Sequence, residues 1–289
     1  MERPGFEEKQ YDNALQLELA AGQPWCYPSA PVLEALLGYD FVIEPGKETI
    51  WEILGTAAPL GLILEPHHWG GRSRPPADRL PSRPISLIIQ AKRSVRLNHW
   101  RAKQHHYWRG AYYRYPIDQD QQLILAGLEA ATSTDAVVRY AAPAFVSWAE
   151  HEKHQAAGQL AEHSSFVSPA VLTGHLVWTY NGPGTTGYAN PDGEEAPADT
   201  LGTLMDVANA NAREQSFAEH ILALQNVAQE LIRSLRFEVS TTRRPARQSQ
   251  VPSFDERVPP DVRDLVQAWL TFSYVVAWAG AAWLIVGFD

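Results

Sequence analysis

The sequence predicts a mixed α/β fold, in which alternating strands and helices are followed by a helical C-terminal region. Apolar β-branched runs indicate buried strands, and capped stretches with helical periodicity indicate the helices between them. The 289 residues are 45% hydrophobic and include ten Trp, eleven Tyr and nine Phe, enough for a sizeable core, which excludes an intrinsically disordered chain. Glycine and proline occur without a period, which excludes collagen and coiled coil.

The N-terminal part of the chain carries the first helix and strand signals. Asp12 or Asn13 can cap a helix that stops at Gly22, and Ser29 can cap a second helix that stops at Gly38. We expect helices over 12–21, 29–38 and 48–54, and strands over 39–44 and 60–65.

The clearest strand covers 84–92, a mostly apolar and β-branched run that follows a Gly-, Arg- and Pro-rich loop over 70–84. After it, we expect helices over 95–113 and 118–131, strands over 136–142, 175–180 and 236–241, loops over 181–198 and 242–260, one helical stretch over 201–235, and a last helix from about Pro260. These elements divide the chain into an α/β core, 1–180, and a helical C-terminal region, 199–289, that packs on it.

The C-terminal stretch 265–288 contains no charged residue and is long enough to cross a membrane. Its Trp residues are spread along it rather than gathered in two belts, and Gln267 and Ser273 interrupt it. We favour a buried helix to about Ala279 followed by a strand over 283–287. A tail anchor and an apolar face for a partner subunit or a second copy of the chain are the alternatives.

Charge is distributed unevenly along the chain. The net charge is −9, yet the segment 79–117 holds nine Lys and Arg and no Asp or Glu. Such a segment suits a polyanion or an acidic partner. A single cysteine, Cys26, excludes an internal disulfide framework, and the N-terminus lacks an apolar signal region, so we expect a cytoplasmic protein.

Two polar residues end the clearest strand, in the tripeptide Gln90-Ala-Lys92, and their spacing places both side chains on one face. Upstream, Asp40 lies in an expected strand that follows a helix carrying Glu34. Over about residues 12–142, this order of helix, strand with Asp, strand with Q-x-K, helix and strand resembles the PD-(D/E)xK nuclease superfamily, in the variant with Gln in the last half-motif. The resemblance implies a restriction-endonuclease-like mixed sheet flanked by helices.

The resemblance also implies roles for the matching residues. Asp40 and Gln90 would bind Mg²⁺ or Mn²⁺, with Glu34 completing the metal shell. Lys92 would orient the attacking water or stabilise charge on the phosphorane, as phosphodiester hydrolysis requires. The 50 residues between Asp40 and Gln90 exceed the gap usual in this superfamily, so either the loop over 70–84 is an insertion or a nearer acid is the ligand, with Glu65 and Glu44 as rivals.

Basic and aromatic residues alternate directly after this strand, on what we expect to be a helix. Its cations would neutralise phosphates and its aromatics could stack on unpaired bases. The other interpretation is an amphipathic helix with a solvated cationic face. Gln121 is either a residue supporting the site or only part of a polar first helical turn capped by Asp118. The expected nucleic-acid contacts are Arg93, Arg96, Arg101, Lys103 and Arg109.

The resemblance, together with the basic segment, implies a metal-dependent nuclease that acts on nucleic acid, with DNA favoured, and it suggests an effector of bacterial defence. A catalytically inactive nucleic-acid-binding or scaffolding protein is the alternative, because Gln90 could mark a decayed site. The G-x-G-x-x-G match at 182–187 is interpreted as an ordered loop, and His151, His154 and His163 as surface residues rather than a zinc site.

Overall fold

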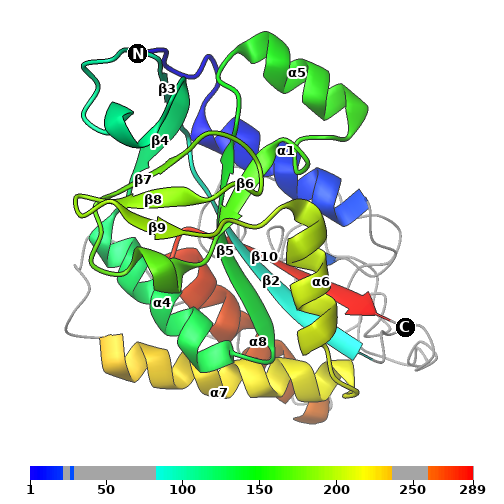
Figure 1. Cartoon of the computed structure of the whole chain (residues 1–289). Helices are drawn as coiled ribbons and strands as arrows, with labels where there is room; N and C mark the ends of the chain where they lie inside the picture. Colours follow the sequence, from blue (N-terminus) through cyan, green and yellow to red (C-terminus); the bar gives the residue numbers. More distant parts are fainter. Residues whose placement is uncertain (22–26, 29–82, 236–259, 289) are drawn as a thin grey trace.

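The computed structural model describes residues 1–21, 27–28, 83–235 and 260–288 (Figure 1). The elements expected over 29–82, the strand expected over 236–241 and the connector expected over 242–259 lie outside the described residues.

The described residues form a mixed α/β fold with two sheets and six α-helices, as the sequence predicts at this level. The helices are α1 (Glu8–Ala21), α4 (Gln119–Thr132), α5 (Trp148–Ala157), α6 (Leu201–Asn211), α7 (Phe217–Leu235) and α8 (Pro260–Trp278), with short 3-10 helices at His105–Tyr107 and Pro169–Leu172. The first sheet has the order β1 (Tyr27–Pro28), β10 (Ala282–Phe288), β2 (Arg83–Ala91), β5 (Ala136–Pro143), β6 (Ser164–Val167). The second has the order β3 (Val95–Leu97), β4 (Tyr112–Pro116), β7 (Val177–Tyr180), β8 (Gly187–Asn190), β9 (Glu194–Ala196).

Strand β2 lies at the centre of the first sheet, antiparallel to β10 and parallel to β5. Helix α4 lies in the connection between the two parallel strands. Both faces of β2 are covered, which is why the strand is apolar almost throughout rather than alternating.

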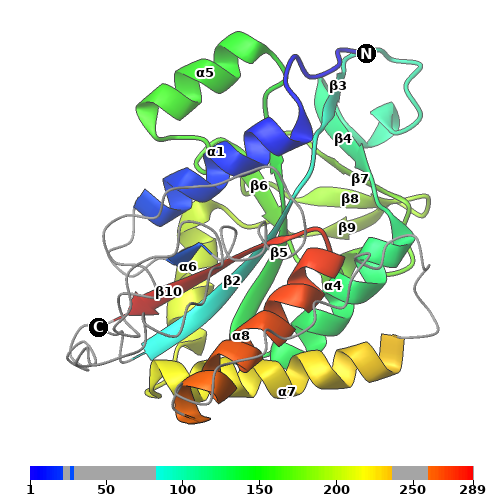
Figure 2. The same cartoon turned by 180° about the vertical axis from the view of Figure 1, so that it is seen from behind.

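Helices cover the first sheet on two sides (Figures 1 and 2). Leu87 and Ile89 of β2 belong to a core cluster with α1 and α6, whereas Ile88 belongs to a cluster with α4, α7 and α8. Because side chains alternate along a strand, Gln90 and Lys92 share the face of Ile88. The polar end of β2 therefore lies on the side of α4 and α8.

The end of the chain completes the central sheet. Helix α8 ends at Trp278, and β10 then pairs between β1 and β2, so the helix and final strand expected from the sequence are confirmed. The side chains of β10 are buried almost to its end. Within the described part of the chain, none of the helices has the length and apolar content that crossing a bilayer requires.

Three expectations about local structure are wrong. The segment 95–113 is no long helix but β3, a loop with a 3-10 turn, and the start of β4, because its Val and Tyr residues pair in an antiparallel hairpin. The segment 181–198 contains β8 and β9. The stretch 201–235 is two helices separated at 212–216. Strands therefore continue after residue 142, and the region 199–289 supplies β10 as well as helices.

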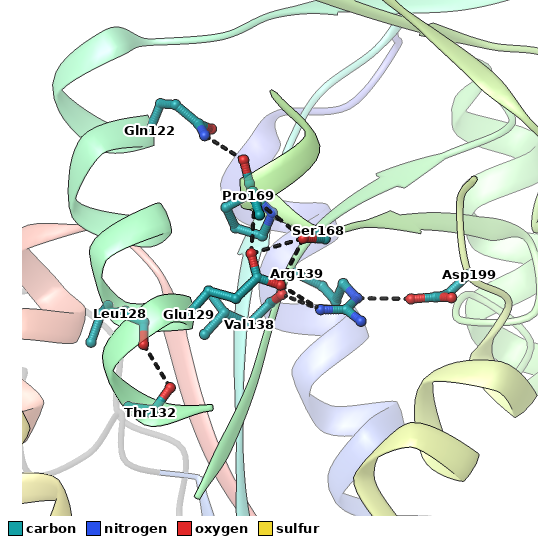
Figure 3. A network of polar contacts seen from close by, with 10 residues as sticks. Gln122, Leu128, Glu129, Thr132, Val138, Arg139, Ser168, Pro169 and Asp199 are labelled. Atoms are coloured by element: carbon teal, nitrogen blue, oxygen red, sulfur yellow. Dashed lines mark hydrogen bonds and ion pairs between the residues drawn. The ribbon is translucent and has the colours of Figure 1, made fainter. Parts of the chain in front are cut away.

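A network of charges connects β5 to α4 and to the segments that follow β6 and precede α6 (Figure 3). The Arg139 Nη1 donates to Glu129 Oε1 of α4 at 3.0 Å, and its Nε donates to Asp199 Oδ2 at 2.8 Å. Glu129 also accepts from the Ser168 hydroxyl and the Ala170 amide. We call Glu129, Arg139, Ser168 and Asp199 the Arg139 network; it fixes α4 against β5 and the turn after β6.

A second polar contact fixes α7 to β2. The Ser86 hydroxyl lies 2.9 Å from Nε2 of His220 and accepts from the Trp283 indole N–H at 2.9 Å. Ser86 and His220 are fully buried. Burial lowers the pKa of His220 to about 4, although Asp135 opposes this shift. The imidazole is therefore neutral at pH 7 and belongs to the core.

Candidate active site at the end of strand β2

Gln90 and Lys92 stand at the carboxyl end of β2 and are both buried, with exposed fractions of 4% and 9%. The Lys92 amide donates to the Ala141 carbonyl at 2.8 Å, so the ladder with β5 continues past the last residue of β2. A buried ammonium loses hydration and needs polar or aromatic neighbours in return. The Lys92 ammonium lies 5.7 Å from the centre of the Tyr140 ring, a cation–π contact.

Helix α4 brings a further amide to Lys92. Asp118 caps the helix by accepting from the Gln121 backbone N–H at 3.0 Å, which places the Gln121 side chain in the first turn. The Lys92 ammonium donates to Gln121 Oε1. Gln121 Nε2 donates in turn to the Ala279 carbonyl at 2.6 Å. The carboxamide is thus held at both ends, with its oxygen facing the ammonium.

The turn between α8 and β10 borders the same cluster. Gly280 has φ +66°, a left-handed conformation that favours glycine. A Cβ atom at this position would lie 3.2 Å from Gln121 Nε2 and 3.5 Å from Gln90 Oε1. Gly280 therefore lets the turn approach both amides.

Among the described residues, the side-chain amide of Gln90 has a hydrogen-bond partner for its nitrogen but not for its oxygen. Its Nε2 donates to the Ala91 carbonyl at 2.7 Å, but among the described residues its buried Oε1 has no hydrogen-bond partner. A buried acceptor that has no partner of any kind costs about 1–3 kcal/mol of folding free energy, so a ligand at this oxygen would be favourable. An amide oxygen is also a ligand that Mg²⁺ and Mn²⁺ accept. The orphaned atom therefore fits the role that the resemblance gives to Gln90.

Phenols line the core beside this cluster. Burial raises the pKa of Tyr115 and of Tyr180 well above the ordinary value, so both phenols are neutral at pH 7. Tyr180 donates to the Pro143 carbonyl at 2.7 Å and lies 2.5 Å from the Ser94 hydroxyl, just after Lys92. These contacts fix the chain where it leaves the first sheet for the second.

The acidic residues expected at the site, Glu34 and Asp40 with the rivals Glu44 and Glu65, lie outside the described residues. Of the expected metal ligands, the structure describes Gln90 alone. Within the described ranges, no three His, Cys, Asp or Glu side chains gather to hold a metal ion.

The expected nucleic-acid contacts fall into two groups, and none lies on the helix that the sequence predicts. Arg93 forms an ion pair with Glu7 at 2.9 Å, and Arg96 forms one with Glu2 at 3.1 Å. The backbones of Arg96 and Glu2 also form a β-bridge. Arg101, Lys103 and Arg109 are exposed in the loop between β3 and β4. Glutamates of the N-terminal segment therefore form ion pairs with two of the five residues that were expected to contact nucleic acid.

The histidines of α5 also differ from expectation. His151 and His154 are buried, not on the surface, and His151 stacks on Trp148 with ring centres 5.2 Å apart. Burial lowers the pKa of both imidazoles. They pack as neutral rings beside Phe6 and Phe145.

Sequence reasoning left the role of Gln121 open, and the structure brings its side chain to Lys92. It missed Ala279 and Gly280 altogether. The glycine that directly follows an apolar helix was a signal for a turn at this place. The residues that Gly280 approaches belong to α4 and β2, which are distant in sequence, so the signal did not connect the turn with the site. Comparison of the chain with family models, curated proteins and solved structures gives no match.

Proposed function

We propose that this protein is a metal-dependent nuclease with a restriction-endonuclease-like core, and that its active site lies at the carboxyl end of β2. One observation carries the proposal. A buried amide oxygen on Gln90 has no partner among the described residues, and it lies two residues from a buried lysine whose ammonium Gln121 holds. A buried polar atom without a partner calls for an explanation, and a bound metal ion is the explanation that the neighbouring lysine favours.

The arrangement of elements supports the same proposal. The resemblance implies a Q-x-K strand followed by a helix and a further strand, and here α4 connects the parallel neighbours β2 and β5. The β3–β4 hairpin is inserted between the Q-x-K strand and that helix. The restriction-endonuclease-like topology itself remains part of the proposal.

Each residue has a chemical task in this proposal. A bound divalent cation would polarise the phosphate and activate water. Gln90 Oε1 and the carboxylate of Asp40 would hold that cation, with Glu34 as a further ligand. Lys92 supplies positive charge beside the scissile phosphate, where negative charge builds up. Gln121 acts as a positioning residue, because its oxygen fixes the direction of the ammonium.

The test is cleavage of supercoiled plasmid, single-stranded DNA and RNA with Mg²⁺ or Mn²⁺. Lys92→Ala and Asp40→Ala should each lower the rate at least about 100-fold, since each removes a transition-state interaction. Lys153→Ala, which removes an exposed lysine of α5, is the matched control and should cleave like the wild type. Thermal melting of each variant verifies the fold.

Wild-type rates in both variants would contradict the proposal. If the wild-type protein binds nucleic acid in EDTA and cleaves none of the substrates with either metal, the inactive binding protein is the better description.

A further inference from the structure

The loop 98–110 between β3 and β4, which we call the Trp100 loop, presents an aromatic ring to solvent among cations. Trp100 is 68% exposed, more than any other described aromatic side chain in the protein. The Arg101 guanidinium lies 4.6 Å from the centre of its ring, and His99 stacks beside it at 5.8 Å and 19°. An exposed tryptophan bracketed by basic groups is not explained by packing.

The loop has a positive charge that nothing described offsets. Arg101, Lys103 and Arg109 are exposed, the loop contains no Asp or Glu, and no ion pair within the described ranges involves them. In contrast, Glu7 and Glu2 hold Arg93 and Arg96. Charge complementarity thus points to an anionic partner at the loop rather than along the whole basic segment.

The base of the loop is anchored, so the exposed part is presented on a fixed support. Tyr107 stacks on Tyr188 of β8 at 4.7 Å and 17°, and Trp108 meets the same ring edge-on at 5.1 Å. A Cβ at Gly193 would overlap the Tyr107 ring, so this glycine permits the approach. Anchoring lowers the ordering cost that the loop would otherwise meet on binding.

From these observations we infer that the Trp100 loop binds unpaired nucleic acid, stacking a base on Trp100 while Arg101, Lys103 and Arg109 contact phosphates. Bases in a duplex are covered by their neighbours, so only an unpaired base can stack on the indole. Phosphate contacts act on single and double strands alike. This inference rests on the proposed function and names its substrate as single-stranded or locally opened nucleic acid.

The experiment measures binding of the full chain in EDTA by fluorescence anisotropy, with a fluorescein-labelled 20-residue oligothymidylate and a hairpin duplex as probes. Trp100→Ala should weaken oligothymidylate binding about tenfold, the effect of losing one stacked base. The same variant should change duplex binding less than about twofold. Trp148→Ala, which removes a 41% exposed tryptophan of α5, is the matched control and should change neither.

A second variant distinguishes the contribution of charge to binding from that of base stacking. Combined Arg101→Ala, Lys103→Ala and Arg109→Ala should weaken both probes and lower the slope of log K against log salt by about 2 to 3. Melting curves show whether each variant folds.

Three results would overturn the inference: an oligothymidylate affinity unchanged by Trp100→Ala, an equal loss for oligothymidylate and duplex, or binding of phosphatidylserine vesicles without binding of oligothymidylate. Because EDTA prevents metal-dependent cleavage, these outcomes do not depend on catalysis. A protein that binds through Trp100 but never cleaves refutes the nuclease, whereas one that cleaves without using Trp100 refutes only the loop's role.

Discussion

Two neighbouring strands of the central sheet carry polar clusters, partly buried on β5 and buried on β2, that differ in how fully their atoms are partnered. On β5, Arg139 donates to carboxylates on both sides, and Glu129 accepts from a hydroxyl and a backbone amide as well (Figure 3). Ile89 of β2 lies opposite Arg139 of β5, so the two clusters are neighbours along the sheet. On β2, however, the Gln90 side-chain oxygen has no hydrogen-bond partner among the described residues. A satisfied network contributes to the stability of the fold, whereas a buried oxygen without a partner can accept a ligand.

Breaking the satisfied cluster should have the largest effect on stability. Arg139→Met leaves Glu129 and Asp199 largely buried without their cation, and we expect a loss of about 3 kcal/mol in the free energy of unfolding. Urea denaturation measures it. Arg233→Met, in an exposed pair with Glu230, should cost less than about 0.5 kcal/mol. If both variants lower the free energy of unfolding equally, the Arg139 network contributes no more to stability than an exposed ion pair.

The buried His220 should make stability depend on pH. Its folded pKa is about 4, below the ordinary 6.5, so between these values the unfolded chain binds more protons than the folded one. Stability should therefore fall as the pH drops from about 6.5, by up to about 3 kcal/mol once the pH is below 4. Denaturation at a series of pH values measures this.

His220→Leu should remove that share of the pH dependence. His151 and His154, whose pKa values are also lowered by burial, act in the same direction, so the variant isolates the contribution of His220. A wild-type pH profile in this variant would contradict the assignment.

Two glycines allow backbone strain to be separated from an effect on the site. Gly280 and Gly158 have φ of +66° and +63°, but only Gly280 has site residues next to its missing Cβ. Replacing either by Ala should cost about 1–2 kcal/mol, the strain of a left-handed Ala. Under the proposed function, Gly280→Ala should also slow cleavage severalfold, because the new Cβ lies 3.2 Å from Gln121 Nε2 and displaces the amide that positions Lys92. If Gly158→Ala slows cleavage by the same factor, the slower cleavage in Gly280→Ala results from lower stability and not from a change at the site.

At the Gln90 end of β2 we expect no loss of stability. Gln90→Met removes an orphaned acceptor at similar volume, so we expect unfolding free energy to stay constant or to rise by about 1 kcal/mol. Cleavage should disappear in the same variant. A loss of several kcal/mol would instead mean that Gln90 is held by structural partners.

Sequence patterns were sufficient where one element carries its own signal. The apolar run of β2, the Asp118 cap of α4 and the final helix and strand were all predicted close to their observed limits. The segment 95–113 misled because its aromatic residues suit a helix face and a hairpin equally well. Pairing of β4 with β7, far along the chain, decides between the two.

The candidate site could be predicted only in part, for the same reason. The Q-x-K spacing on one strand is local, and it identified Gln90 and Lys92. The contact of Lys92 with Gln121, and of Gln121 with the Ala279 carbonyl, joins three distant parts of the chain. Pairing of Arg93 and Arg96 with N-terminal glutamates likewise requires α1 and β3 to be placed first.

The most direct test of the central claim is calorimetric titration of Mn²⁺ into the wild-type protein, Gln90→Leu and Gln90→Glu. If Gln90 Oε1 is a metal ligand, the leucine should weaken binding at least about tenfold, and the glutamate, a charged oxygen donor at the same place, should strengthen it. The same Mn²⁺ affinity in all three proteins would contradict the account.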